Sequence, residues 1–282
     1  MPCIGGLVRI AIGLVYDGSQ FDGWQTQPSG RGVQDQLEQA LATIAAHPVR
    51  VIAAGRTDTG VHATGQVAHF DTDALRPTQA WVRGVNSHLP PSMAVQWAVA
   101  TANDFHARFS ARARTYRYVL YASPIRPVLH HAQVGWCHAP LDIDAMRSGA
   151  QALIGRHDFS SFRAADCQAK TAVRTLHALT IETRGAMILF TLRADAFLYH
   201  MVRNIIGALV YVGKGAHPPA WLGTLLAQRD RRAAPPTFAA AGLYLAEVEY
   251  DPVFGIPAPT SESPWFETHS DPARAIAPGV GG

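Results

Sequence analysis

The sequence has few cysteines, and none of them are spaced like metal ligands. Cys3, Cys137 and Cys167 are odd in number and far apart, and no Cys-x-x-Cys pair occurs. This spacing predicts neither a zinc site nor a disulfide framework, and it favours reduced thiols in a cytosolic protein. Walker-type phosphate loops, the His-Glu-x-x-His motif and the dinucleotide-binding glycine pattern are also missing. We therefore expect no metal and no organic cofactor.

Long apolar runs are missing too. No stretch reaches the length of a membrane span, and residues 1–6 lack the basic start of a signal peptide. We therefore expect a cytoplasmic protein without a membrane partner. The net charge of +3 and the pI near 8.9 permit nucleic-acid binding without requiring it. The 282 residues, 48% of them hydrophobic, suffice for one or two domains.

Alternation and helical spacing predict two halves, residues 7–104 and 105–250, each with the order β-α-β-β-α-β. In the first half we expect strands at 8–14, 49–54, 66–71 and 94–99, and helices at 33–47 and 78–88. In the second we expect strands at 115–121, 173–183, 187–194 and 243–250, and helices at 142–153, 195–212 and 219–229. The pattern predicts an α+β fold of two ferredoxin-like halves with mainly antiparallel sheets. The Pro- and Gly-rich residues 251–282 are expected to be mostly disordered.

A glycine-rich loop at residues 54–67 is the most informative segment. Its glycines allow tight turns and close approach of a ligand, and Arg56 and Asp58 lie two residues apart within it. A carboxylate on a loop between two strands is typical of a reactive group. The alternative is an ordinary turn residue, which is the commoner use of aspartate.

The run AGRTDTGVHATGQVAHF, which contains Asp58, resembles the catalytic segment of the TruA family of tRNA pseudouridine synthases. Further motifs follow in that family's order across about residues 7–250, among them GWQTQ at 23–27, FHAR at 105–108, RTYRY at 114–118, ADAFLYHMVRN at 194–204 and AGLYL at 241–245. The resemblance implies a homodimer with a catalytic cleft between the two halves of each chain. It also implies that the substrate is uridine at positions 38, 39 and 40, in the anticodon arm of tRNA.

Arg203 lies in the predicted helix 195–212, whose residues are apolar nearly all round, so the helix should be buried. A buried arginine needs a partner, unless its side chain reaches the surface. The resemblance places an arginine of this motif beside the catalytic aspartate, so we expect Arg203 to pair with Asp58. A positive charge there favours the ionised carboxylate, which can act as a nucleophile. Whether Asp58 attacks ribose C1′ or first assists the loss of uracil in another way is open.

Tyr116 and Tyr118 face the same side of a predicted strand, and both could be core aromatics. The resemblance places Tyr116 over the target uracil, where it could stack and accept the proton from C5. Tyr118 is expected in the core. Arg56 is expected to clamp a phosphate or to fill the space left by a flipped nucleotide. Further phosphate contacts are expected from a run of arginines that could otherwise be a solvated surface: Arg108, Arg112, Arg114 and Arg117.

Two other functions fit parts of the pattern. One is a non-catalytic RNA-binding module, and the other is a pseudouridine synthase that acts on a different RNA. The combination of Asp58, Tyr116 and Arg203 argues against a pure binder, which needs no carboxylate facing phosphate. No local motif excludes a different RNA. We expect smaller structural roles for three further residues: Asp195 as a helix cap, His62 as a hydrogen-bonding loop residue, and Asp158 without a specified contact.

Overall fold

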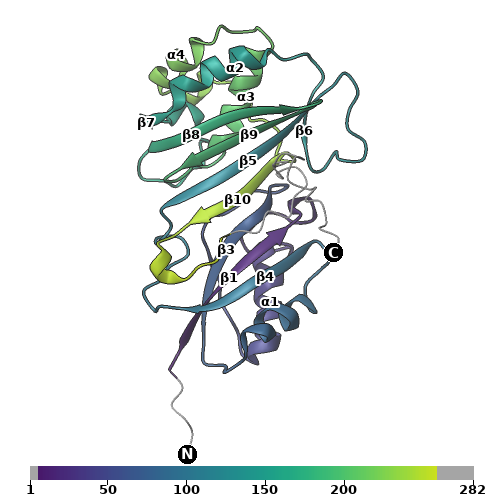
Figure 1. Cartoon of the computed structure of the whole chain (residues 1–282), viewed down its shortest axis with the longest axis vertical. Helices are drawn as coiled ribbons and strands as arrows, with labels where there is room; N and C mark the ends of the chain where they lie inside the picture. Colours follow the sequence, from purple (N-terminus) through teal and green to yellow (C-terminus); the bar gives the residue numbers. More distant parts are fainter. Residues whose placement is uncertain (1–5, 259–282) are drawn as a thin grey trace, which may run out of the picture.

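The computed structural model describes residues 6–258, and ten strands in this range form a single sheet (Figure 1). The order across the sheet is β4-β1-β3-β10-β5-β9-β8-β7, with β2 beside β3 and β6 beside β5. Neighbouring strands are antiparallel except β10 with β3 and β5 with β6. The strands are β1 Val8–Tyr16, β2 Ile52–Ala53, β3 His62–Thr72, β4 Met93–Thr101, β5 Ala113–Ala122, β6 Gly135–Cys137, β7 Gly155–Asp158, β8 Val173–Arg184, β9 Met187–Ala194 and β10 Leu243–Glu249.

The last strand, β10, joins the two halves of the sheet. It pairs with β3 through Tyr244 opposite His62 and with β5 through Leu243 opposite Tyr118. The chain therefore returns from the second half to lie beside the strand that follows the Asp58 loop. A mixed α+β fold with a large, mostly antiparallel sheet is what the sequence pattern predicted.

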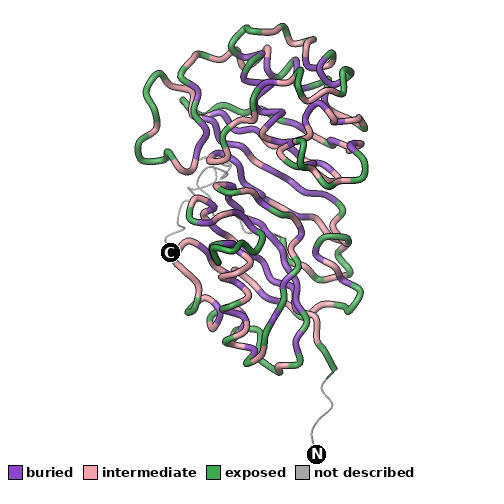
Figure 2. Tube along the Cα trace, turned by 180° about the vertical axis from the view of Figure 1, so that it is seen from behind, coloured by how far each residue is buried: buried purple, intermediate pink, exposed green. Residues whose placement is uncertain are grey.

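The helices lie toward the two ends of this sheet (Figure 1). Helix α1 is beside β1 and β4, whereas α2, α3 and α4 gather near β7, β8 and β9. Their bounds are α1 Val33–Ala45, α2 Ile143–Ala150, α3 Met201–Gly213 and α4 Trp221–Gln228. Figure 2 shows buried residues along the strands and on the inner sides of the helices. No helix within residues 6–258 is both long and apolar enough to cross a bilayer.

Several predicted elements are present. Asp142 caps α2 as expected, because its Oδ1 accepts the N–H of Ala145 at 2.9 Å. The β8–β9 hairpin turns at Gly185, which has a φ of +59°. The predicted helix at 78–88 is present with a π-helical segment at Ala80–Gly84. Strand β2 is shorter than predicted, because the N–H of Val51 is bound by the side chain of Glu38 at 2.9 Å instead of by a strand.

The predicted start of the helix at Asp195 is wrong, since α3 begins at Met201. Asp195 caps no helix: its Oδ1 accepts the N–H groups of Thr175 and Ala196, at 3.0 and 2.6 Å. Residues 195–200 instead form a connection that ends at His200, which has a φ of +60°. The connection packs Phe197 edge-on against Tyr116, with ring centroids 5.0 Å apart.

The segment expected to be mostly disordered, residues 251–282, begins with an ordered stretch. Phe254 packs edge-on against Phe105 at 5.2 Å, and its carbonyl accepts the hydroxyl of Thr101 at 3.1 Å. Residues 251–258 therefore belong to the folded body. The rest of the segment lies outside the described residues.

Candidate active site

The carboxylate of Asp58 meets two basic side chains, one from the residue just before α3 and one from the first turn of α3. Its Oδ2 lies 3.3 Å from Nη1 of Arg203 and 3.2 Å from Nε2 of His200. All three side chains are partly buried, with exposed fractions of 23%, 15% and 22%. Among residues 6–258 no hydrogen-bond or ion-pair partner is recorded for Oδ1. The two carboxylate oxygens therefore differ in their surroundings.

Arg203 is directed at Asp58 by a second contact on its own guanidinium. Its Nε donates to the carbonyl of Phe238 at 2.8 Å. Only 15% of the Arg203 side chain is exposed. The alternative that this side chain reaches the surface instead of pairing is therefore wrong. The expected contact between Arg203 and Asp58 is present, while its catalytic use stays a prediction.

The backbone of the Asp58 loop is fixed from several sides. The N–H of Trp24 donates to the carbonyl of Thr57 at 2.9 Å, and that of Val61 donates to the carbonyl of Asp58 at 3.0 Å. Gly23 has a φ of +95°, and a Cβ there would lie 3.0 Å from the carbonyl oxygen of Thr57. Only glycine fits at this close approach. The motif around Gly23 and Trp24 thus holds the Asp58 loop in place.

His62 links the far end of this loop to its surroundings. It is the first residue of β3 and is buried, with Nδ1 accepting the N–H of Gly18 at 3.1 Å. Its Nε2 lies 2.9 and 3.0 Å from the carbonyl oxygens of Ala132 and Ala241. His62 therefore forms hydrogen bonds, as predicted, but from the start of a strand.

Tyr116 is buried with its hydroxyl close to the Asp58 loop. A Cβ built on Gly55 would lie 3.7 Å from that hydroxyl. Burial raises the pKa of Tyr116 to about 12; the nearby charge of Asp58 also raises it, whereas that of Arg114 lowers it. The side chain is therefore a neutral phenol at physiological pH. Tyr118 is fully buried and donates to the carbonyl of Ala239 at 2.9 Å, which confirms its predicted place in the core.

Arg114 is buried, so the expectation that it contacts a phosphate is corrected. It is 9% exposed, and burial lowers its pKa. Its Nε and Nη2 donate to the carbonyl of Ala54 at 3.2 and 2.9 Å, Nη2 also donates to that of Arg108 at 2.8 Å, and Nη1 to that of Asp195 at 3.1 Å. The guanidinium ties together three segments around the site, because its donors are used by backbone carbonyls.

The other predicted RNA contacts differ from one another. Arg56 is exposed, and the described part of the chain offers it no recorded partner. Arg108 is exposed with its guanidinium carbon 5.6 Å from the centre of the Phe109 ring. Arg112 is exposed but forms an ion pair with Asp251. Arg56 and Arg108 thus have charges not neutralised by a carboxylate, whereas that of Arg112 is already paired.

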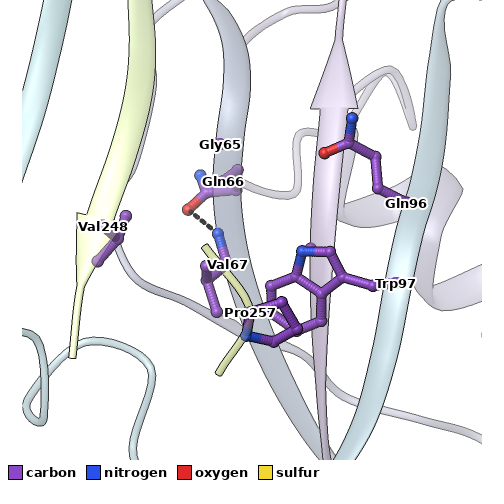
Figure 3. Close-up of a pocket in the computed structure, with 8 residues that line it drawn as sticks. Gly65, Gln66, Val67, Gln96, Trp97, Val248 and Pro257 are labelled. Carbon is purple, nitrogen blue, oxygen red and sulfur yellow. Dashed lines mark hydrogen bonds between the residues drawn. The ribbon is translucent and has the colours of Figure 1, made fainter. Parts of the chain in front are cut away.

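A small pocket lies elsewhere on the sheet, where Trp97 covers Gly13 (Figure 3). Gly65, Gln66, Val67, Gln96, Val248 and Pro257 complete its lining, and the side chain of Gln66 accepts the N–H of Val67 at 3.2 Å. None of Asp58, Tyr116, His200 and Arg203 lines this pocket. Within residues 6–258 no three His, Cys, Asp or Glu side chains gather as metal ligands would.

The sequence matches the tRNA pseudouridine synthase family over residues 14–110 and 150–251. A protein named tRNA pseudouridine synthase A from Bordetella petrii is 58% identical over 248 residues, which cover 87% of this chain and 92% of the relative. Proteins of the same name from Paraburkholderia xenovorans and Thiobacillus denitrificans are 53% and 54% identical, covering 94% and 92% of this chain and 99% and 100% of the relatives.

Solved structures are more distant. A chain of a Cbf5-Nop10-Gar1 complex aligns with 84% of this chain and 48% of its own length, at 12% identity and a TM-score of 0.38. The family match covers Asp58, His200 and Arg203, whereas Tyr116 lies between the two matched segments.

Proposed function

The chain belongs to the tRNA pseudouridine synthase family, and we propose that it converts uridine to pseudouridine at positions 38, 39 and 40 of tRNA, with Asp58 as the nucleophile. The observation that supports this role of Asp58 is that the two oxygens of its carboxylate have different contacts. Arg203 and His200 both contact Oδ2, and Oδ1 is left without a recorded partner in the described chain. Such a fixed, partly buried carboxylate is suited to nucleophilic catalysis.

The reaction breaks the bond between ribose C1′ and uracil N1 and forms one between C1′ and C5. In the proposed sequence, Oδ1 of Asp58 assists the departure of uracil as an anion, by attack on C1′ or otherwise. The base then turns, C5 bonds to C1′, the C5 proton leaves and N1 gains a proton. Atoms and electrons balance without an oxidant, a reductant or a transferred group.

The packing of Tyr116 is consistent with these reaction steps. Its ring is held edge-on by Phe197, and its hydroxyl is adjacent to Gly55 of the Asp58 loop. We propose that the ring stacks on the uracil. The hydroxyl is the proposed acceptor of the C5 proton, although a neutral phenol is a weak base. That role therefore requires the proton to be passed on in the same step.

The finer organisation of the fold belongs to the same proposal. Residues 7–104 and 105–250 would be two ferredoxin-like halves. In support, four strands of each half follow one order, fourth, first, third and second, when the short strands β6 and β7 of the second half are left out of the numbering. They run β4-β1-β3-β2 in the first half and β10-β5-β9-β8 in the second. Each half would contribute one side of the site, since Asp58 comes from the first and Arg203 from the second.

A homodimer in the cytoplasm completes the proposal. The tRNA would be held across two subunits. One subunit would bind part of the tRNA away from the target uridine, while the active site of the other subunit carries out the reaction. A mass measurement in solution tests this part by itself, because a fully active monomer would contradict it.

The experiment for the activity uses tRNA whose uridines carry tritium at C5, since each isomerisation releases one C5 proton. The purified chain should release tritium, and pseudouridine-specific sequencing of cellular RNA, with and without the protein, should place the product at positions 38 to 40. Binding of tRNA without release would favour the non-catalytic RNA-binding module. Release at uridines of another RNA would favour a synthase with a different substrate.

A further inference from the structure

Phe109 is an aromatic ring left in water but held in a fixed position. It lies on the connection between β4 and β5, and 75% of its surface is exposed. Its ring stacks on that of His106, with centroids 4.3 Å apart and an angle of 28° between the planes. A single exposed apolar residue is ordinary on a protein surface. An exposed ring with a stacked support needs a further explanation.

The support is itself rigid. Nδ1 of His106 accepts the backbone N–H groups of Arg108 and Phe109, both at 3.2 Å. Burial lowers the pKa of His106, which favours the neutral form of its ring. Behind it, the ring of the buried His69 packs edge-on at 4.9 Å, and Nδ1 of His69 accepts the N–H of Ala107 at 3.1 Å. A row of rings thus runs from the core to Phe109, which loses little freedom when a partner binds.

The position of this row relates it to the catalytic loop. The guanidinium of Arg114 donates both to the carbonyl of Arg108 and to that of Ala54, at 2.8 and 2.9 Å. Ala54 is four residues before Asp58 in the same loop. The connection that carries Phe109 therefore lies against the base of the Asp58 loop, within the span of a bound RNA.

The charges around Phe109 fit a polyanion. Arg108 is exposed with its guanidinium above the Phe109 ring, and Arg56, near Asp58, is exposed without a recorded partner in residues 6–258. Proteins hold unpaired bases by stacking them on aromatic rings beside cations that contact the phosphates. This pairing of features distinguishes an RNA surface from an apolar protein contact.

We propose that His106 and Phe109 form a stacking shelf for an unpaired nucleobase of the RNA substrate, with Arg108 on the adjoining phosphate. The shelf rests on the proposed function, since it describes how the same site holds its RNA beyond the target uridine. The occupant is a base, recognised through its flat face, so little sequence preference is expected.

The test measures equilibrium binding of an anticodon-arm stem-loop RNA to the full chain, followed by fluorescence anisotropy. Phe109→Ala should weaken binding about 10- to 100-fold, the range expected for loss of one stacked base. Phe109→Trp should bind as the wild type does, because it keeps a flat ring. Phe109→Leu should bind as weakly as Phe109→Ala, because it keeps apolar bulk without a ring. At RNA concentrations below saturation, tritium release by Phe109→Ala and Phe109→Leu should fall by the same factor as RNA binding, because the proposed loss is one of substrate affinity.

Tyr211 provides a matched control. It is also a partly exposed ring stacked on a histidine, with centroids 6.3 Å from His217, but it lies on α3. Tyr211→Ala should leave RNA binding unchanged. The shelf is overturned if Phe109→Leu binds as well as the wild type, or if Phe109→Ala lowers the melting temperature and the saturated rate together. The shelf is also overturned if Phe109→Ala changes the molecular mass of the protein in solution, because the surface around Phe109 would then be an interface between two copies of the chain.

Failure of the shelf and failure of the enzyme assignment give different results. A wild-type protein that releases no tritium contradicts the activity, while weakened RNA binding in Phe109→Ala would still support the shelf. Normal release with unaffected binding in Phe109→Ala contradicts the shelf alone.

Discussion

His200 and Asp58 meet through a single oxygen: Nε2 of the histidine lies 3.2 Å from Oδ2 of the carboxylate. Arg203 reaches the same oxygen at 3.3 Å. The carboxylate is therefore contacted at one oxygen by two basic side chains, one just before α3 and one in its first turn. His200 adopts a φ of +60°, which is uncommon for a residue other than glycine. That backbone conformation is what brings its ring toward Asp58.

We expect His200→Ala to lower the single-turnover rate by up to about 10²-fold, the scale of loss when a reacting group is slightly misplaced. RNA binding should change little, because the ring contacts Asp58. His200→Gln retains an N–H donor and should recover part of the rate. The measurement is tritium release with enzyme in excess over tRNA. An Ala variant as fast as the wild type would show that Arg203 alone orients the carboxylate.

Asp58→Asn should fold and bind tRNA but release no detectable tritium, because an amide of nearly the same shape cannot act as an anionic nucleophile. Asp58→Ala should bind RNA at least as well as the wild type, since it removes a negative charge near phosphates. Melting temperature and RNA affinity serve as controls for folding. Turnover by purified Asp58→Asn close to that of the wild type would falsify the nucleophile assignment.

Tyr116→Phe separates the ring from the hydroxyl. If the hydroxyl accepts the C5 proton, turnover should fall by about 10² to 10⁴ while binding changes little, because the ring still stacks. Tritium release in single turnover gives the rate, and anisotropy gives the affinity. An unchanged rate would remove the hydroxyl from proton transfer and leave stacking as the role of Tyr116.

Local patterns predicted most of the sheet and helices, but the start of α3 depends on distant groups. Phe197 and Leu198 continue the apolar spacing of a helix, and Asp195 has the side chain of a good cap. In the structure the carboxylate of Asp195 is used by Thr175 on β8, 20 residues away in sequence. That interaction stops the helix from starting at Asp195, and a local pattern cannot reveal it.

The candidate site was predicted only in part, again because some of its contacts join residues that are far apart in the sequence. Asp58 stands out because its loop is rich in glycine, and Arg203 because it interrupts an apolar helix. Arg114 looks like its neighbours in a basic run, yet its carbonyl partners at Ala54 and Asp195 are 60 and 81 residues away. One local signal was available: alternation in β5 places Arg114 on the same face as the core residue Tyr118.

His200 was missed as a site residue for a related reason. It lies three residues before Arg203, and residues at that spacing share one face of a helix. That spacing could have drawn attention to a second partner for Asp58. The contact itself arises differently, because His200 precedes the first turn of α3 in a left-handed conformation.

The salt dependence of RNA binding should distinguish the arginines. Each phosphate neutralised contributes about −0.7 to the slope of log affinity against log salt on single strands and about −0.9 on duplex. Arg108→Ala should make the slope shallower by about one such step. Arg114→Met should leave the slope unchanged but lower the melting temperature, because it leaves buried carbonyls without donors. An unchanged slope for Arg108→Ala would mean that Arg108 is a solvated surface residue that contacts no phosphate.

Stability should fall steeply in alkaline solution because buried tyrosines resist ionisation. An ordinary phenol has a pKa near 10.0, whereas burial raises that of Tyr116 to about 12. Burial also raises the pKa of four other tyrosines: Tyr16, Tyr118, Tyr244 and Tyr250. Between pH 10 and 12 the unfolded chain therefore binds fewer protons than the folded chain, so the free energy of unfolding decreases as pH rises.

Tyr116→Phe isolates one of these groups. Between its pKa in the unfolded chain and its pKa in the folded chain, each such tyrosine lowers the free energy of unfolding by about 1.4 kcal/mol per pH unit. Below pH 10 the tyrosine is protonated in both states, and its full contribution to stability is present. The variant should lose stability less steeply than the wild type between pH 10 and 12, by about that amount. Denaturant unfolding at pH 9, 10.5 and 11.5 gives the slopes. Equal slopes for variant and wild type would mean that Tyr116 ionises as readily in the folded chain as in the unfolded one.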